Sequence, residues 1–151
     1  MQVQPLTEDR FADFVGLIEA LAEYERLPAL DPAAVARLRA DAFAARPRYE
    51  AALAVDDRGE AVGYAIWFET YSSFRARPTM YLEDLFVIEA ARGSGAGRLL
   101  FEHVRRLGQE RGCGRMDWQV LAWNTLARDF YARRGAHWLQ DWLTYRIDYP
   151  L

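Results

Sequence analysis

The stretch LEDLFVIEAARGSGAGRLLFEH, residues 82 to 103, decides the fold. It begins as a nearly continuous apolar segment, passes through three alternating glycines and ends in an amphipathic pattern. The apolar part predicts a central strand, residues 80–88, that is covered on both faces. Leucines and a valine at helical spacing between residues 99 and 107 predict the helix that follows the glycines.

The glycine turn, residues 92–97, reads Arg-Gly-Ser-Gly-Ala-Gly. Glycines let a ligand approach the backbone, and the first turn of a helix offers free N–H groups and a positive dipole end. The turn therefore suits a phosphate or pyrophosphate, although it could also be a flexible connection. A P-loop is excluded because its Lys-Ser/Thr pair is missing. A dinucleotide-binding fingerprint ranks low because it requires a glycine where Arg98 stands and normally follows the first strand.

The other elements follow from periodicity and from start and stop signals. Thr7 is expected to cap a helix that runs to about Tyr24, and Asp31-Pro32 starts a second helix. This second helix is expected to cover 33–45. Expected further elements are a strand at 2–5, a hairpin of strands 49–55 and 61–69, a loop at 71–79, a strand at 116–121, a helix at 124–134 closed by Gly135, and strands at 138–139 and 142–147. The order β-α-α-β-β-β-α-β-α-β predicts an α/β (α+β) fold with a mixed sheet, in one domain spanning residues 1–151.

Composition limits the classes of function. Of 151 residues, 52% are hydrophobic and 14% aromatic, which predicts a packed globule. A net charge of -3 predicts no general attraction to nucleic acid or to anionic membranes. The single cysteine, Cys113, and a first segment without the features of a signal peptide predict a cytoplasmic protein. His103 and His137 have no partners at metal-ligand spacing, so no metal site is expected.

At this point the chain resembles the GNAT acyl-CoA-dependent N-acetyltransferases. Their signature, [RQ]-x-x-G-x-[GA] after the fourth strand, matches Arg92, Gly95 and Gly97. The similarity is closest to the spermidine/spermine (diamine) acetyltransferase branch and extends over nearly the whole chain. It rests on these segments: Leu21-Ala22-x-Tyr24-Glu25, Tyr81–Asp84 followed by Phe86-Val87, VLAWN at 120–124, and Phe130-Tyr131-x-Arg133-Arg134-Gly135-Ala136. The resemblance implies a mostly antiparallel central sheet flanked by helices.

The resemblance also implies the co-substrate and its contacts. Acetyl-CoA is expected, with its pantetheine beside the backbone of Leu85, Phe86 and Val87. A backbone N–H there would polarise the thioester carbonyl. The remaining residues expected at the cofactor are Arg92, Gly93, Ser94, Gly95, Ala96, Gly97 and Arg98 at the pyrophosphate, together with Asn124, Tyr131 and Arg133. Asn124 could also simply cap its helix, and the arginines could be ordinary surface residues.

Two residues are predicted to be catalytic. A carboxylate inside an apolar strand is costly, and the resemblance makes Glu83 a base that acts through water. Alternatively, Glu83 is a carboxylate at a wet strand end that pairs with a basic side chain. Strand alternation sends Glu83 and Asp84 to opposite faces unless a bulge intervenes. The resemblance makes Tyr131 the general acid for the leaving thiolate. Alternatively, Tyr131 is a core tyrosine that packs its ring.

The resemblance nominates Tyr24, Glu25, Glu83, Asp84 and Trp142 for the acceptor, because carboxylates and aromatic rings suit an ammonium ligand. Glu25 could equally be solvated at a helix end. The segment Gln140–Trp142 is one residue shorter than in the family, which opens the choice between a polyamine, a diamine and a thialysine-like amine. A protein amino terminus or an antibiotic amine would be alternative acceptors, and a non-catalytic acyl-CoA-binding sensor is the alternative from another class. A homodimer is expected.

Overall fold

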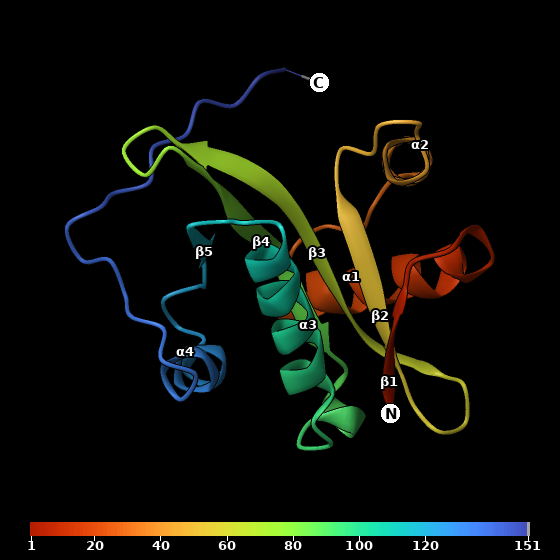
Figure 1. Cartoon of the computed structure of the whole chain (residues 1–151). Coiled ribbons are helices and arrows are strands. Elements are labelled where there is room, and N and C mark those ends of the chain that lie inside the picture. Colours follow the sequence, from red (N-terminus) through yellow and green to blue (C-terminus); the bar gives the residue numbers. More distant parts are fainter. Residues whose placement is uncertain (151) are drawn as a thin grey trace. The chain divides into compact units, whose positions relative to one another are not determined.

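The computed structural model describes residues 1 to 150, which form two compact units. The first unit, Met1–Trp118, contains the whole sheet and most of the helices (Figure 1). Its elements are β1 (Gln2–Pro5), the short 3-10 turn η1 (Glu8–Arg10), α1 (Phe11–Glu25), α2 (Pro32–Ala42), β2 (Glu50–Val55), β3 (Ala61–Ser72), β4 (Arg77–Val87), the 3-10 turn η2 (Glu89–Ala91), α3 (Ala96–Glu110) and β5 (Arg115–Trp118). The second unit starts at Gln119 and contains α4 (Thr125–Ala132). The assignment of the chain to a single domain stays a prediction.

The sheet has five strands in the order β1-β2-β3-β4-β5. Neighbouring strands are antiparallel except β4 and β5, which are parallel. A parallel pair needs a crossover connection, and α3 provides it. The predicted mixed α/β fold with a mostly antiparallel sheet is therefore confirmed.

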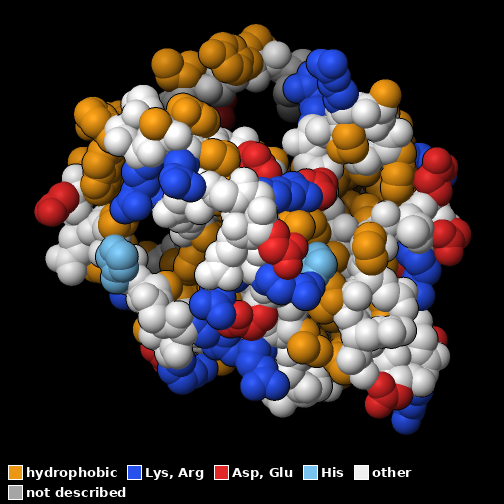
Figure 2. Space-filling view, viewed as in Figure 1, with side chains coloured by type: hydrophobic (Ala, Val, Ile, Leu, Met, Phe, Trp, Pro, Cys, Tyr) orange, Lys and Arg blue, Asp and Glu red, His pale blue; other side chains and the backbone are white. Residues whose placement is uncertain are grey.

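Helices cover both faces of this sheet, with α3 in front and α1 behind in Figure 1. Behind the sheet, Phe11, Phe14 and Leu17 of α1 form one buried cluster with Leu53, Val55, Tyr64, Ile66 and Phe86 of the strands. In front, Leu100 and Val104 of α3 are fully buried. The outer side of α3 carries opposite charges next to one another, including the Arg105–Glu102 pair, and Figure 2 shows this mixture.

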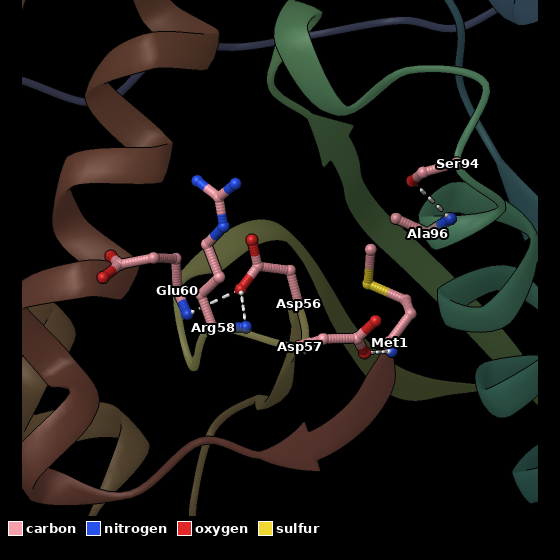
Figure 3. Close-up of polar contacts among 7 residues, drawn as sticks. All are labelled: Met1, Asp56, Asp57, Arg58, Glu60, Ser94 and Ala96. Atoms are coloured by element: carbon pink, nitrogen blue, oxygen red, sulfur yellow. Dashed lines mark hydrogen bonds and ion pairs between the residues drawn. The ribbon is translucent and has the colours of Figure 1, made fainter.

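Local signals explain several of the element boundaries. The Asp31 side chain accepts a hydrogen bond of 2.6 Å from the backbone N–H of Ala34, which confirms the predicted start of α2. In the β2–β3 turn, Asp56 accepts from the backbone N–H groups of Arg58 and Glu60, as Figure 3 shows. Thr7 occupies the N-cap position of η1, which runs directly into α1, so the predicted start of the helix is confirmed. Its side chain makes no capping hydrogen bond. A 3-10 turn, a common form of the first turn of a helix, forms there before α1 begins.

The predicted loop at 71–79 is also wrong for most of its length. Strand β3 continues to Ser72 and β4 begins at Arg77, with Tyr71 opposite Pro78 and Thr70 opposite Thr79. The segment is polar and contains a proline, and this composition alone indicates a loop. In the structure, pairing along the hairpin overrides composition.

The two predicted C-terminal strands, 138–139 and 142–147, are absent from the described residues, whose last strand is β5. Strand β5 itself ends at Trp118 rather than at residue 121. The aromatic and β-branched residues of 142–147 favour a strand, but strand propensity does not supply a hydrogen-bonding neighbour. The predicted order of elements is therefore wrong in its final strand. No described helix is long and apolar enough to cross a membrane.

Gly63 allows β3 to lie very close to the end of β4. A Cβ at this position would lie 2.6 Å from the carbonyl oxygen of Phe86 and 2.9 Å from Val87 Cγ2. We expect Gly63→Ala to destabilise the protein by about 1–3 kcal/mol, because the nearest atom belongs to the backbone and β4 must shift. Thermal and chemical denaturation would measure this loss.

Gly16 provides the matched control because a Cβ there meets nothing within 4 Å. Gly16→Ala in α1 should stabilise the protein by up to about 1 kcal/mol through helix propensity. Equal stability of Gly63→Ala and the wild type would contradict the proposed close approach.

Candidate active site

An extra residue in β4 shapes the candidate site. Trp67 of β3 lies opposite Leu82, and the preceding Ile66 lies opposite Asp84, so Glu83 has no residue opposite it. This is a β-bulge, and it shifts the alternation of side chains by one residue. Before the bulge, Met80 lies against Gly108 of α3. After it, Asp84 and Phe86 lie on the α1 side.

Asp84 is bound directly by a buried tyrosine. The hydroxyl of Tyr64, which is fully buried, donates a hydrogen bond of 3.2 Å to Asp84 Oδ2. Burial raises the pKa of Asp84 to about 6; the negative charge of Glu83, and more weakly that of Glu25, acts in the same direction, while the bond from Tyr64 opposes the rise. Burial and the nearby carboxylates also raise the pKa of Tyr64, so its phenol keeps its proton and donates.

Glu25, Glu83 and Asp84 form an acid cluster next to aromatic rings. Glu25 is the last residue of α1, and burial raises its pKa. The Phe86 ring lies 6.4 Å from the Tyr24 ring and 6.3 Å from the Tyr64 ring, between centroids. All the charges that act on the pKa of Asp84 are those of carboxylates. This arrangement of negative charge beside aromatic rings can attract a cation.

Past the bulge, β4 has an open edge. Strand β5 pairs with β4 only from Thr79 to Leu82, whereas the pairing of β4 with β3 continues to Val87. In the described sheet, no strand therefore covers the second edge of Leu85–Val87. Backbone N–H and C=O groups at such an edge can pair with an extended ligand.

The glycine turn lies between η2 and α3. Gly93 and Gly95 adopt φ values of +80° and +94°, which side chains rarely allow, and a Cβ at either position would meet open space. Gly95 precedes the first residue of α3 and cannot cap it with a side chain. Ser94 Oγ accepts a bond of 3.4 Å from the N–H of Ala96, as Figure 3 shows. The start of α3, with Gly97 and the exposed Arg98 in its first turn, therefore presents backbone donors beside an open surface.

Arg92 extends from this turn toward α1. Its guanidinium carbon lies 4.9 Å from the centroid of the Tyr24 ring. Its Nε donates a bond of 3.4 Å to the carbonyl oxygen of Val87. The glycine turn, the end of β4 and the end of α1 thus meet at one side chain.

Comparison with known proteins identifies the family. The sequence profile described as the acetyltransferase (GNAT) family matches residues 14–136. The chain belongs to the GNAT family of acetyltransferases. Its predicted membership is confirmed, and so is the prediction that it is an enzyme.

The curated relatives of this GNAT acetyltransferase include N-acetyltransferases of small molecules. The thialysine N-epsilon-acetyltransferase of Bos taurus is 31% identical over 158 residues, covering 98% of this chain and 92% of that protein. The spermidine/spermine N(1)-acetyltransferase-like protein 1 of Homo sapiens is 30% identical over 131 residues, which are 82% of this chain and 19% of that longer protein. A probable acetyltransferase of known structure has the same fold, with a TM-score of 0.83 at 18% identity, covering 99% of each chain.

Four of the predicted site residues lie in the second unit. Asn124 accepts a bond of 3.1 Å from the N–H of Ala127 and so caps α4, which confirms that interpretation of the residue. Tyr131 packs edge-on against Phe130, with 5.2 Å between ring centroids, and Arg133 follows the last residue of α4. Trp142 lies outside any helix or strand. Their roles at the cofactor and the acceptor stay predictions.

Two features of the site were not found in the sequence. Tyr64, the hydrogen-bond donor to Asp84, reads as an ordinary apolar strand residue. The contact of Arg92 with Tyr24 joins segments far apart in the chain. Only the register of β3 against β4 could have revealed the first, because it places Phe86 opposite Tyr64 and Asp84 two pairs further along, on the same face.

Asp84 should make stability depend on pH. Its pKa of about 6 lies above the ordinary value of 3.8, so the folded state binds this proton more tightly than the unfolded state. The resulting stabilisation is present below about pH 3.8 and is lost as the pH rises through about 6. Asp84→Asn keeps an acceptor for Tyr64 but removes the charge. We expect its melting temperature to exceed that of the wild type by roughly 3 °C or more at pH 7.5, and the two to converge near pH 4.

Glu60→Gln, in the exposed β2–β3 turn, serves as the control for the loss of a carboxylate. Melting temperatures of all three proteins across this pH range would provide the test. A constant difference between Asp84→Asn and the wild type at every pH would contradict the raised pKa.

Proposed function

We propose that this GNAT enzyme transfers an acetyl group from acetyl-CoA to a primary amine of a small cationic substrate. The acceptor class is a polyamine, a diamine or a thialysine-like amine, and the transfer is direct. The acid cluster carries this proposal: the charges of Glu83 and Glu25 add to burial in raising the pKa of Asp84, which lies against the phenol of Tyr64. An ammonium ligand would relieve that repulsion and contact the aromatic surface.

Acetyl-CoA fits the residues at the open edge of β4. It supplies the acetyl group as a thioester. The backbone of Leu85, Phe86 and Val87 would pair with the pantetheine, and a backbone N–H would polarise the thioester carbonyl. The turn from Arg92 to Arg98 would hold the pyrophosphate on backbone N–H groups, because two glycines with positive φ leave the backbone uncovered.

Glu83 suits proton removal from the acceptor. An alkyl ammonium has a pKa near ~10.4, so little free amine exists at neutral pH. Glu83 is exposed at the bulge, next to the half-buried Asp84, and would take the proton through a water molecule while Asp84 and Glu25 attract the cation. Tyr131 would donate a proton to the leaving sulfur, Asn124 and Arg133 would contact the cofactor, and Trp142 would contact the acceptor.

The relatives support this class of acceptor. The protein from Bos taurus is named for thialysine and the protein from Homo sapiens for spermidine and spermine. All three compounds carry primary amines.

We further infer that the enzyme acts as a cytoplasmic homodimer. Light scattering after size exclusion should give about twice the chain mass of 17.4 kDa.

Release of free CoA from acetyl-CoA, measured against a panel of amines, tests the reaction. The panel contains spermidine, putrescine, thialysine, lysine, an aminoglycoside and an amino-terminal peptide. All 19 residues counted as Lys or Arg are arginines, so acetylation of the protein's own lysines cannot raise the background. We expect turnover with one of the first four amines. Turnover restricted to the aminoglycoside or the peptide would replace the proposed substrate class, and binding of acetyl-CoA without any turnover would favour a sensor.

Glu83→Gln and Tyr131→Phe test the two catalytic roles. We expect each to lower kcat by about 10²–10⁴-fold, the usual contribution of general acid–base catalysis. Glu89→Gln is the matched control, because Glu89 is also exposed and lies near the glycine turn but outside the acid cluster. Full activity of Glu83→Gln would eliminate Glu83 as the base, and full activity of Tyr131→Phe would eliminate Tyr131 as the acid.

A further inference from the structure

The contact between Arg92 and Tyr24 connects the glycine turn to a residue that the sequence assigns to the acceptor. The guanidinium carbon of Arg92 lies 4.9 Å from the centre of the Tyr24 ring, well within the range of a cation–π interaction. Tyr24 is half-buried next to the end of α1, and Arg92 is exposed. A long, exposed side chain is therefore held against a ring that is itself partly buried.

Strand β4 fixes both partners of this contact. The Phe86 ring lies 6.4 Å from the Tyr24 ring, and the adjacent Val87 accepts the bond from Arg92 Nε. The ring beneath Arg92 and the carbonyl beside it thus depend on two consecutive residues of one strand. These are residues of the open edge of β4, where the pantetheine is proposed to bind.

A cation–π contact with one ring leaves most of the hydrogen-bonding capacity of the guanidinium intact. The group carries five N–H donors, which lie in its plane and point outward from its edge. Nε is bonded to Val87, so the two terminal nitrogens remain for a ligand. Within residues 1 to 150, no carboxylate forms an ion pair with Arg92. An uncompensated guanidinium with in-plane donors is suited to bidentate binding of a phosphate group.

We propose that Tyr24 is a positioning residue for Arg92 and orients its guanidinium toward the pyrophosphate of CoA. This inference rests on the proposed function, since it requires CoA at the glycine turn. It gives Tyr24 a role on the cofactor side, whereas the sequence predicts one at the acceptor. The physical gain is pre-organisation, because a long side chain that is already oriented loses less conformational freedom when the ligand binds.

Dissociation constants for CoA, measured by calorimetry without any amine, provide the test. Tyr24→Leu removes the ring and should weaken CoA binding about two- to fivefold, the range expected for an exposed cation–π contact. Tyr24→Phe keeps the ring and should restore the affinity. Tyr24→Met is a second variant without a ring, to be used if Tyr24→Leu does not fold, and circular dichroism would establish the folding of each protein.

A double-mutant cycle separates positioning from a general structural effect. If Tyr24 acts through Arg92, then Tyr24→Leu combined with Arg92→Met should bind CoA no more weakly than Arg92→Met alone. The matched control is Arg39, which stacks at 5.3 Å on the Phe11 ring in another part of the fold. Arg39→Met should bind CoA as the wild type does.

The outcomes distinguish this inference from the proposed function. If the wild type does not bind CoA, the proposed function and the inference both fail. If the wild type binds CoA but Tyr24→Leu binds it equally well, or if the losses of the two single variants add in the double variant, the inference alone is wrong. A rise in the KM of Tyr24→Leu for the amine, without a change in CoA affinity, would return Tyr24 to the acceptor side.

Discussion

One unpaired residue, Glu83, is the constraint on which the rest of the site depends. It places a bulge in β4 between Leu82 and Asp84, and the pairing of β4 with β5 also ends at Leu82. Without the bulge, strict alternation would place Asp84 and Phe86 on the α3 side with Met80. The register shift instead sends them to the α1 side, where Tyr64 and Tyr24 are located. The acid cluster, its aromatic rings and the open strand edge all follow from this local change.

The acid cluster differs from the other carboxylates of the fold in its surroundings. Glu50 accepts a bond of 2.8 Å from Arg111, and Asp13 accepts one of 2.6 Å from Arg10. Asp84 instead has a neutral phenol as its donor and two carboxylates as its charged neighbours. Like charges in a partly buried site repel each other, and this repulsion lowers the stability of the folded state. A site of this kind gains most from a ligand that is itself a cation, which is why the electrostatics support an amine acceptor.

Strand β4 also ties the two halves of the proposed site together. Its Phe86 contacts the rings of both Tyr24 and Tyr64, and its Val87 accepts the bond from Arg92. Movement of this strand would therefore change the acid cluster and the glycine turn at once. Gly63 supports the strand at the same place, because its missing side chain lets β3 approach Phe86 and Val87 closely. The chemistry proposed for the site thus depends on the relative position of β3 and β4.

The sequence by itself determined the elements whose signals are local. The apolar strand, the glycine turn and the helix after it follow from residues 82–103, because periodicity and glycine conformation depend on near neighbours. The cap at Asp31 was predictable for the same reason. The sequence also indicated the family, since the motif around Arg92 is contiguous, and the profile match bears this out.

Only the tertiary structure decided which side chains meet. The sequence left open whether a bulge interrupts the alternation at Glu83 and Asp84, and the register of β3 against β4 shows that it does. The partners Tyr64 for Asp84 and Tyr24 for Arg92 come from distant segments, and no local pattern encodes such contacts. The same limit explains the errors at 71–79 and 142–147, because a strand exists only where another strand accepts its hydrogen bonds. Composition fixes what a segment can form, and long-range pairing selects what it does form.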